Sequence, residues 1–360
     1  MKSLGNFPDP FIAEIAGQPE ALRRAAQGLA SQLPSLTRLA GMARGGERSA
    51  LPIFTGMGSS YFACYPAVTE LAASGTAALH IGTAELVHFR RGLLNPDTAL
   101  IAVSQSGRSA ELVRLAGELG ESATRPVTVA VTNGLDNPLA AGADIQLDTM
   151  AGDEACPSTM TFAAALVVVA AVGAVLAGES AADVPVRLLA ETESAAVAVE
   201  ELLAERSLAD RLVECLGTRD AIVLLGRGAS RAAAEMGALT LKEAVGLPAE
   251  SLETGQFRHG PLEIAGPRLA ALVIAVEPET LALDVGLTEE LLAASASVAL
   301  VSPEGDGPTA ALRVPIGHIS RALAPAVAIV PAQLLAWQLA VLGGREPGSF
   351  VLASKVTTRE

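Results

Sequence analysis

One pattern occurs twice in this chain: an apolar run that ends in a glycine-rich turn and is followed by a helical stretch. The segment IFTGMGSSYFACYPAVTELA, from Ile53, aligns with VLLGRGASRAAAEMGALTLKEA, from Val223. The later apolar runs pair between the halves in the same order, Ala99 with Leu269, Val127 with Ser297 and Ala143 with Leu312. Each half then closes with a long apolar helical stretch, over 162–176 and 326–341. A repeat of this kind indicates two copies of one structural unit.

Within each half the order reads strand–helix–strand–helix–strand–strand–helix. Apolar strands that alternate with helices are typical of a parallel sheet with helices on both faces. The sequence therefore predicts an α/β fold with two tandem, doubly wound parallel sheets. Ala, Leu and Val must build the core, because half of the 360 residues are hydrophobic but only 3% are aromatic. We expect five segments: a helical arm over 1–34, a first domain over 35–184, a linker helix over 185–216, a second domain over 217–345 and a tail over 346–360.

Two turns of the first half are rich in glycine and hydroxyl side chains. They read Gly56-Met57-Gly58-Ser59-Ser60 and Ser104-Gln105-Ser106-Gly107-Arg108-Ser109. A strand–turn–helix unit directs free backbone N–H groups and hydroxyls to the positive end of a helix dipole, which suits a phosphate group. The alternative role of these serines is to cap the helices that follow them. The second half has Val276-Glu277-Pro278-Glu279 in place of the second turn, so we expect phosphate in the first half only.

Composition excludes several classes of partner. The net charge of −14 argues against nucleic acid and against an anionic membrane surface. The three cysteines are widely spaced and show no metal-binding pattern, so we expect no metal and no organic cofactor. The N-terminus lacks the hydrophobic core of a signal peptide, which favours a cytoplasmic protein. The apolar stretch over 162–176 is shorter than the roughly 20 residues that span a bilayer, so we expect a core helix there.

Taken in order, the motifs of this chain resemble the sugar isomerase (SIS) family, in particular the isomerase half of glutamine–fructose-6-phosphate aminotransferases and its stand-alone relatives. The motifs that carry the resemblance are Glu14 with Gln18-Pro19, Gly58-Ser59-Ser60-Tyr61, Ser104-Gln105-Ser106-Gly107, Leu241-Lys242-Glu243, Arg258-His259-Gly260-Pro261-Leu262 and Leu352-Ala353-Ser354-Lys355-Val356-Thr357. The resemblance covers nearly the whole chain. It implies two tandem SIS domains, each a flavodoxin-like three-layer sandwich, a sugar-phosphate substrate, no cofactor, and a homodimer with shared active sites.

The resemblance also implies which residues hold the substrate. These are Ser59, Ser60, Ser104, Gln105, Ser106, Ser109 and, in a polar loop before the first long apolar helix, Glu154. Hydroxyls and a carboxamide donate hydrogen bonds to phosphate oxygens without a fixed charge. Arg108 stands where the aminotransferases have an acid, and it either faces solvent or adds charge near the ligand.

Three residues match the family's catalytic positions. Glu243 corresponds to the acid–base residue that moves a proton between adjacent sugar carbons. His259 corresponds to the histidine that opens the sugar ring and reaches the neighbouring subunit's site. Lys355 lies in the C-terminal active-site tail, one position after Ser354, with which the aminotransferase lysine aligns. Stand-alone relatives have a similar Ser-Lys-Val-Thr tail, so the resemblance still implies that Lys355 supplies the amine that forms an iminium with the open-chain ketose. The alternatives are a solvated helix carboxylate, a histidine in a surface turn and an exposed lysine near the terminus.

Three family lysines are replaced here, by Met160, Thr240 and Ser354, which weakens the case for the aminotransferase reaction. No cysteine lies near Met1, so we expect no glutaminase, and deamination of an amino sugar is favoured over its synthesis. The predicted function is that of a phosphosugar isomerase or an amino-sugar-6-phosphate deaminase/isomerase. The alternative is a sugar-phosphate sensor without turnover, which the lysine replacements favour and which Glu243 and His259 oppose.

Overall fold

The computed structural model describes residues 9–44, 50–217, 219–352 and 354–359. The chain divides into two compact units. The first unit comprises Glu20–Asp153, Met160–Glu193 and Leu352–Glu360. The second unit comprises Met1–Pro19, Glu154–Thr159 and Ser194–Val351. Each unit is built around one five-stranded sheet.

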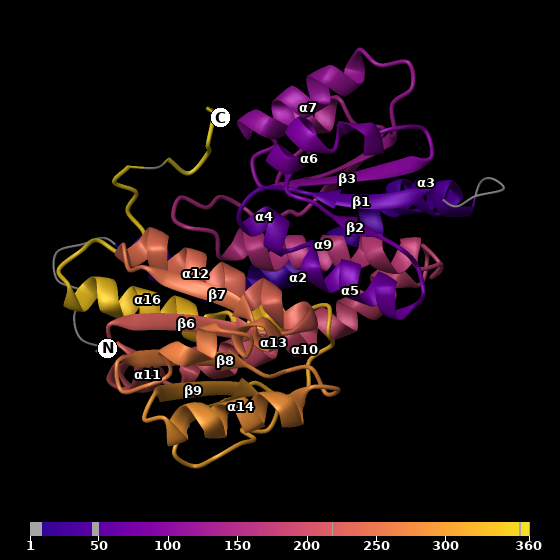
Figure 1. Ribbon diagram of the computed structural model, residues 1–360. Helices are drawn as coiled ribbons and strands as arrows, with labels where there is room; N and C mark the ends of the chain where they lie inside the picture. Colours follow the sequence, from indigo (N-terminus) through magenta and orange to yellow (C-terminus); the bar gives the residue numbers. More distant parts are fainter. Residues whose placement is uncertain (1–8, 45–49, 218, 353, 360) are drawn as a thin grey trace. The chain divides into compact units, whose positions relative to one another are not determined.

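The sheet of the first unit is entirely parallel (Figure 1). Its strands are β1 (Leu51–Thr55), β2 (Leu79–His80), β3 (Thr98–Ser104), β4 (Val127–Thr132) and β5 (Ile145–Asp148). Their order across the sheet is β2-β1-β3-β4-β5. The chain thus crosses from one side of β1 to the other between β2 and β3, and this reversal gives the sheet its doubly wound form.

Helices cover both faces of this sheet. The helices of the unit are α2 (Gln18–Ser31), α3 (Leu33–Arg44), α4 (Ser59–Phe62), α5 (Tyr65–Ala73), α6 (Thr83–Phe89), α7 (Ala110–Gly120), α8 (Pro138–Ala141) and α9 (Met160–Leu176). On one face Ile53 and Leu100 pack with Leu86 of α6 and Leu115 of α7. Successive strand side chains alternate between faces, so Ile101 points to the opposite side. There α9 packs against α3, α5 and β4, and it is buried over almost all of its length. The prediction of a core helix over 162–176 is thereby confirmed.

The second unit repeats the topology of the first. Its strands are β6 (Ala221–Gly226), β7 (Ala249–Glu253), β8 (Leu269–Ile274), β9 (Ser297–Ser302) and β10 (Leu312–Pro315). All are parallel, in the order β10-β9-β8-β6-β7, which is the order of the first sheet with each strand replaced by its counterpart. The prediction of two tandem, doubly wound sheets is therefore confirmed.

The helices of the second unit form the outer layers of the second sandwich. They are α1 (Pro10–Ala16), α11 (Leu208–Leu216), α12 (Arg231–Val245), α13 (Thr254–Phe257), α14 (Leu281–Ala293), α15 (Ala324–Ala328) and α16 (Val330–Leu342). Leu287 and Leu291 of α14 pack on one face of the sheet with Val223, Ala271 and Leu300. α16 packs against both α11 and α12, while α11 contacts β8 and β9 and α12 contacts β6 and β8. The helix α10 (Val184–Ala204) is shared between the two units, because its residues are divided at position 194.

Each sheet has one edge strand more than the four that the sequence pattern predicts. β2 has only two residues, and β7 reads Ala-Glu-Ser-Leu-Glu, with Glu250 exposed. An edge strand has a neighbour on one side only and does not need a continuous apolar run, so neither segment carries the signal used to find strands. The predicted linker helix over 185–216 is likewise two helices, α10 and α11, because the chain turns at 205–207.

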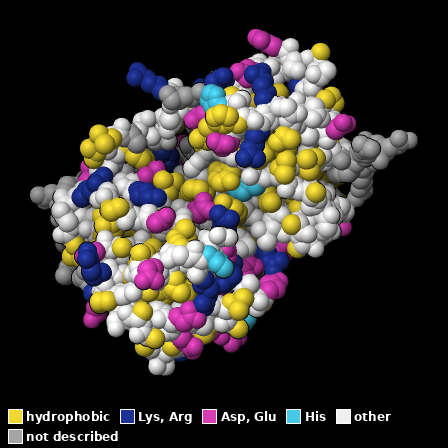
Figure 2. Space-filling model, in the orientation of Figure 1, with side chains coloured by type: hydrophobic (Ala, Val, Ile, Leu, Met, Phe, Trp, Pro, Cys, Tyr) yellow, Lys and Arg dark blue, Asp and Glu magenta, His cyan; other side chains and the backbone are white. Residues whose placement is uncertain are grey.

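Within the described part of the chain, one helical stretch is long and apolar enough to cross a membrane. It covers Ala324–Leu342, and 83% of its most hydrophobic window is buried inside the protein. Burial of that degree is what the core helix of a folded domain requires. On the face shown in Figure 2, acidic and basic side chains are interspersed, so no continuous basic patch forms there.

A hydroxyl-lined pocket at the switch point of the first sheet

The strand order of the first sheet reverses between β1 and β3, and both serine-rich turns lie at this point. Open α/β sheets bind ligands in the crevice outside the carboxyl ends of the strands, where the order reverses. The turn after β1 contains Gly58 with a positive φ of 51°, a conformation that glycine adopts at little cost. The second turn directly follows β3. Residues 45 positions apart in the sequence, Ser60 and Gln105, therefore meet at one edge of the sheet.

Three serine hydroxyls hold the two turns in place by accepting backbone N–H groups. Ser60 Oγ accepts the N–H of Gln105 at 3.2 Å, and this bond joins the two turns. Ser104 Oγ accepts the N–H of Gly107, and Ser106 Oγ accepts the N–H of Arg108, both at 3.1 Å. A serine hydroxyl has one proton to donate besides the lone pairs with which it accepts. Among the described residues none accepts these three protons, so each remains available to a ligand.

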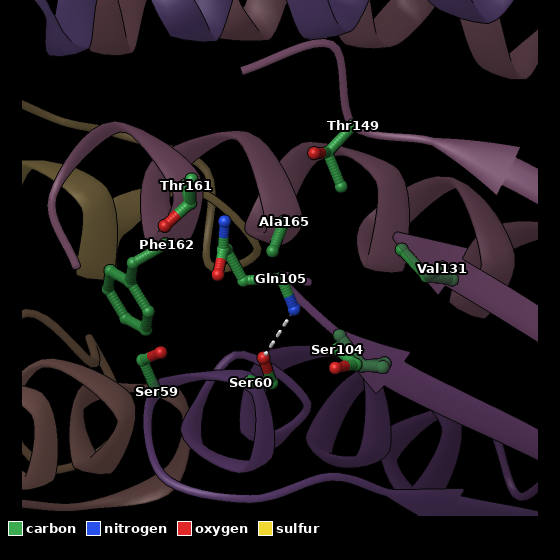
Figure 3. A pocket seen from close by; sticks show the side chains of 10 residues that line it. Ser59, Ser60, Ser104, Gln105, Val131, Thr149, Thr161, Phe162 and Ala165 are labelled. Carbon is green, nitrogen blue, oxygen red and sulfur yellow. Dashed lines mark hydrogen bonds between the residues drawn. The ribbon is translucent and has the colours of Figure 1, made fainter. Parts of the chain in front are cut away.

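Two of these serines line a small pocket in the first unit (Figure 3). Its lining residues are Ser59, Ser60, Val103, Ser104, Gln105, Val131, Thr149, Thr161, Phe162 and Ala165. In Figure 3 the Gln105 side chain lies between Thr161 and Ser60, with Ser59 nearby. The lining is therefore polar but uncharged, and its apolar part comes from β3, β4 and the start of α9. A wall of this kind suits a small ligand that carries its own charge and is gripped by neutral donors.

Thr149 and Thr161 are lining residues that the sequence did not single out. Thr149 directly follows β5, and Thr161 is the second residue of α9. A signal existed for Thr149, since parallel strands all place their carboxyl ends at one edge of the sheet. No local signal marks Thr161, because only the packing of α9 brings it to the pocket.

The remaining residues of the second turn lie outside this pocket. Ser109 occupies the N-cap position of α7 but its side chain makes no capping hydrogen bond, so the alternative role as a cap is not realised. The first N–H of α7, at Ala110, donates instead to the carbonyl of Thr357 in the C-terminal tail, at 3.1 Å. Arg108 is exposed and donates to the carbonyl of Asp136 at 2.8 Å. Of its two expected positions, the guanidinium takes the one on the surface.

Glu154 lies in a short loop of the second unit and is not among the residues that line the pocket. Its carboxylate accepts the N–H of Thr159 at 2.8 Å and the hydroxyl of the same residue at 3.0 Å. The buried carboxylate of Glu14 in α1 accepts the next two N–H groups, of Ala155 at 2.6 Å and of Cys156 at 3.1 Å. Two carboxylates therefore fix the shape of this loop.

The three residues assigned to catalysis by resemblance fall in different units. Glu243 is half-buried near the end of α12, and His259 is exposed two residues after the end of α13, both in the second unit. Lys355 is half-buried and groups with the first unit. The loop of His259 is anchored by Glu253, whose carboxylate caps α13 by accepting the N–H groups of Gly255 and Gln256, both at 2.8 Å.

The replacement of a lysine by Thr240 has a structural consequence. Thr240 is fully buried in α12, and its hydroxyl donates to the carbonyl of Met236 at 2.9 Å. The hydroxyl is thus used inside its own helix. No amine chemistry is possible at this position.

Comparison with known proteins gives the family. Residues 52–174 and 216–343 match the SIS domain. The isomerizing glutamine–fructose-6-phosphate aminotransferase of Pseudomonas putida is 30% identical over 303 residues, which cover 80% of this chain and 48% of that protein. The chain spans about half the length of the curated relatives it matches.

Solved structures share the fold. The C-terminal domain of glucosamine-fructose-6-phosphate aminotransferase from Francisella tularensis superposes with a TM-score of 0.83 at 22% identity, over 95% of this chain and 98% of that one. Glucosamine-6-phosphate deaminase from Thermotoga maritima gives 0.72 at 19% identity, over 97% and 99%. Because the two matched regions coincide with the two parallel sheets and together span more than half of the residues, the chain belongs to the SIS domain family.

Proposed function

We propose that this protein is a phosphosugar isomerase or an amino-sugar-6-phosphate deaminase/isomerase that acts on a hexose or hexosamine 6-phosphate. The observation that carries the proposal is the uncharged pocket at the switch point, where Ser60 and Ser104 each retain a proton to donate. Family membership supports it, since the matched relatives are named as aminotransferases of fructose 6-phosphate.

The phosphate of the substrate would bind at the two serine turns of the first unit. The hydroxyls of Ser60 and Ser104 each accept a backbone N–H, which fixes the oxygen and leaves its proton for a ligand. Donors held in place before the ligand arrives lose little freedom on binding. Neutral donors of this kind would bind the phosphate of a sugar without a lysine or arginine in the lining, even in a protein with a net charge of −14.

The chemical step would be a proton transfer between adjacent sugar carbons. Glu243 would take the proton from one carbon and return it to the next, His259 would open the ring, and Lys355 would act on the open-chain carbonyl. With an amino sugar, the same transfer followed by hydrolysis of the resulting imine releases ammonia and a ketose phosphate. Glu154 would fix the shape of its own loop, where its carboxylate accepts the N–H and the hydroxyl of Thr159.

The test is to incubate the purified protein with hexose and hexosamine 6-phosphates and to measure ketose and ammonia together. Ammonia with ketose phosphate identifies a deaminase, and ketose alone identifies an isomerase. Glu243→Gln should lower turnover roughly 10²-fold or more while phosphate binding is retained. Glu235→Gln, on the same helix but paired with Arg231, is the control and should keep turnover. Full turnover in Glu243→Gln or in His259→Ala would remove that residue from the mechanism.

A second candidate is a sugar-phosphate sensor without turnover. The buried Thr240, whose hydroxyl is used within α12, favours it because an amine of the family is lost there. Phosphosugars would then raise the melting temperature while no product forms and no deuterium enters next to the carbonyl. Incorporation of deuterium would exclude the sensor.

We also propose a cytoplasmic homodimer in which His259 serves the partner's site. Mixing Glu243→Gln with His259→Ala tests this arrangement. If each site takes its glutamate from one chain and its histidine from the other, random mixing restores about a quarter of wild-type turnover, since half of the dimers have one intact site. If each site lies within one chain, mixing restores nothing.

A further inference from the structure

The second sheet retains the turn that would hold a phosphate. Its strand order reverses between β6 and β8, as the first sheet reverses between β1 and β3. Gly228, in the turn after β6, has a φ of 49°, against 51° for its counterpart Gly58. The turn leads into α12, a helix of 15 residues whose positive end lies at this point. The backbone features that favour an anion are thus present twice in the chain.

A carboxylate of the protein itself occupies the second of these turns. Glu277 lies in the segment that takes the place of the second serine turn, after β8, and is only 6% exposed. Its Oε1 accepts the N–H of Ala229 at 2.9 Å. The same oxygen lies 3.2 Å from the place where a Cβ of Gly228 would be, so the carboxylate sits directly against the turn.

Arg321 compensates the buried charge of this carboxylate. Its Nε donates to Oε2 of Glu277 at 2.7 Å, and a second nitrogen pairs with the exposed Glu279. A carboxylate that is held by a backbone N–H at a helix start and by a guanidinium has the partners of a bound phosphate. The hydroxyl of Ser230, fully buried in the same turn, has no hydrogen-bond partner among the described residues.

A ligand could reach this place from solvent. Glu277 and Arg321 both line a pocket of about 190 Å³ in the second unit. Most of its other walls are apolar, from residues such as Val276, Leu281 and Ile316. Lack of access from solvent therefore does not explain why the second turn would bind no phosphate when the first turn does.

We propose that Glu277 is the built-in occupant of a second anion site and that it confines phosphate binding to the first sheet. The inference takes the phosphate site of the first sheet from the proposed function. It makes Glu277 a specificity-determining residue, because the carboxylate both fills the space and repels an incoming phosphate. Loss of the carboxylate should leave Arg321 and the N–H of Ala229 facing an open pocket.

The experiment is equilibrium dialysis of the full chain with labelled inorganic phosphate. The wild type should bind one phosphate per chain, and Glu277→Ser should bind two. Glu279→Gln also loses a partner of Arg321 but leaves the turn filled, so it should bind one. The double variant Glu277→Ser with Arg321→Ala should bind at the new site at least about tenfold more weakly than Glu277→Ser.

The outcomes separate this inference from the proposed function. A folded Glu277→Ser protein that binds no more phosphate than the wild type overturns the inference, as does a wild type that already binds two. If Glu277→Ser does not fold, Glu277→Ala also empties the turn without adding a buried hydroxyl and should gain the second site; absence of that site in the folded Glu277→Ala protein is equally decisive. A wild type that binds none while Glu277→Ser binds one would refute the phosphate site of the first sheet and leave this inference standing.

Discussion

The bond between Ser60 and Gln105 gives the sharpest prediction about the pocket. Ser60 is 8% exposed, and its hydroxyl joins the two turns while its proton is left for the ligand. Replacement by alanine removes both contributions at once. We therefore expect Ser60→Ala to weaken phosphate binding and to lower the stability of the first unit.

The two magnitudes follow from the surroundings. A hydrogen bond to a charged group contributes about 1.5–3 kcal/mol, but the freed N–H of Gln105 can turn to the phosphate and offset part of the loss, so we expect a Kd about tenfold higher. Without ligand the same N–H loses its partner. An unpaired buried N–H costs about 1–3 kcal/mol of folding free energy. Because this N–H borders a pocket that water can enter, we expect a loss of about 1 kcal/mol, which corresponds to a melting temperature lower by about 2–4 °C.

Calorimetric titration with inorganic phosphate and a thermal melt measure the two effects. Ser122→Ala is the matched control, because Ser122 Oγ also accepts a backbone N–H, of Thr124 at 3.3 Å, in an exposed turn past the other end of α7. It should leave Kd unchanged and stability within about 0.5 kcal/mol. An unchanged Kd in folded Ser60→Ala would refute the assignment of this hydroxyl as a donor to phosphate. An equal loss in Ser122→Ala would show that the effect is not local to the pocket.

Two further predictions concern packing and charge. Gly237→Ala should lower the free energy of unfolding by about 2 kcal/mol, because the new Cβ would lie 2.5 Å from the buried Leu224. In the control Gly117→Ala the new Cβ meets nothing within 4 Å, so this change should raise the free energy of unfolding by up to about 1 kcal/mol. Chemical denaturation measures both changes. If both variants gained stability, or both lost it, the close packing around Gly237 in α12 would be contradicted. The hydrogen-bonded pairing with Arg125 holds the pKa of Asp144 below its usual range, so this pair stabilises the folded state above the carboxyl's unfolded pKa. The deficit of Asp144→Asn should therefore be complete at neutral pH, should begin to shrink below about pH 4 and should be lost as the pH falls through the lowered pKa of the folded carboxyl; a deficit that does not shrink in acid would contradict the ion pair.

Much of the fold could be read from the chain because its signals are local. Apolar runs in the sequence predicted eight strands, four in each half, and the matching turns at Gly58 and Gly228 indicated the repeat. The two strands that were missed, β2 and β7, are formed by pairing at a sheet edge, and pairing leaves no pattern in a short or polar segment. The break between α10 and α11 was missed because both sides have helical composition.

In the candidate site, too, some features could be predicted from the sequence and others arise only on folding. The positions of the glycine and serine turns could be predicted, because neighbouring residues encode strand, turn and helix. The bond between Ser60 and Gln105, and the pocket that they share with Thr149 and Thr161 but not with Ser109, arise only on folding. Folding likewise brings Glu277 to the second turn with Arg321 beside it. Parallel strands bring together residues far apart in the chain, and the direction in which each side chain then points depends on packing that no local pattern records.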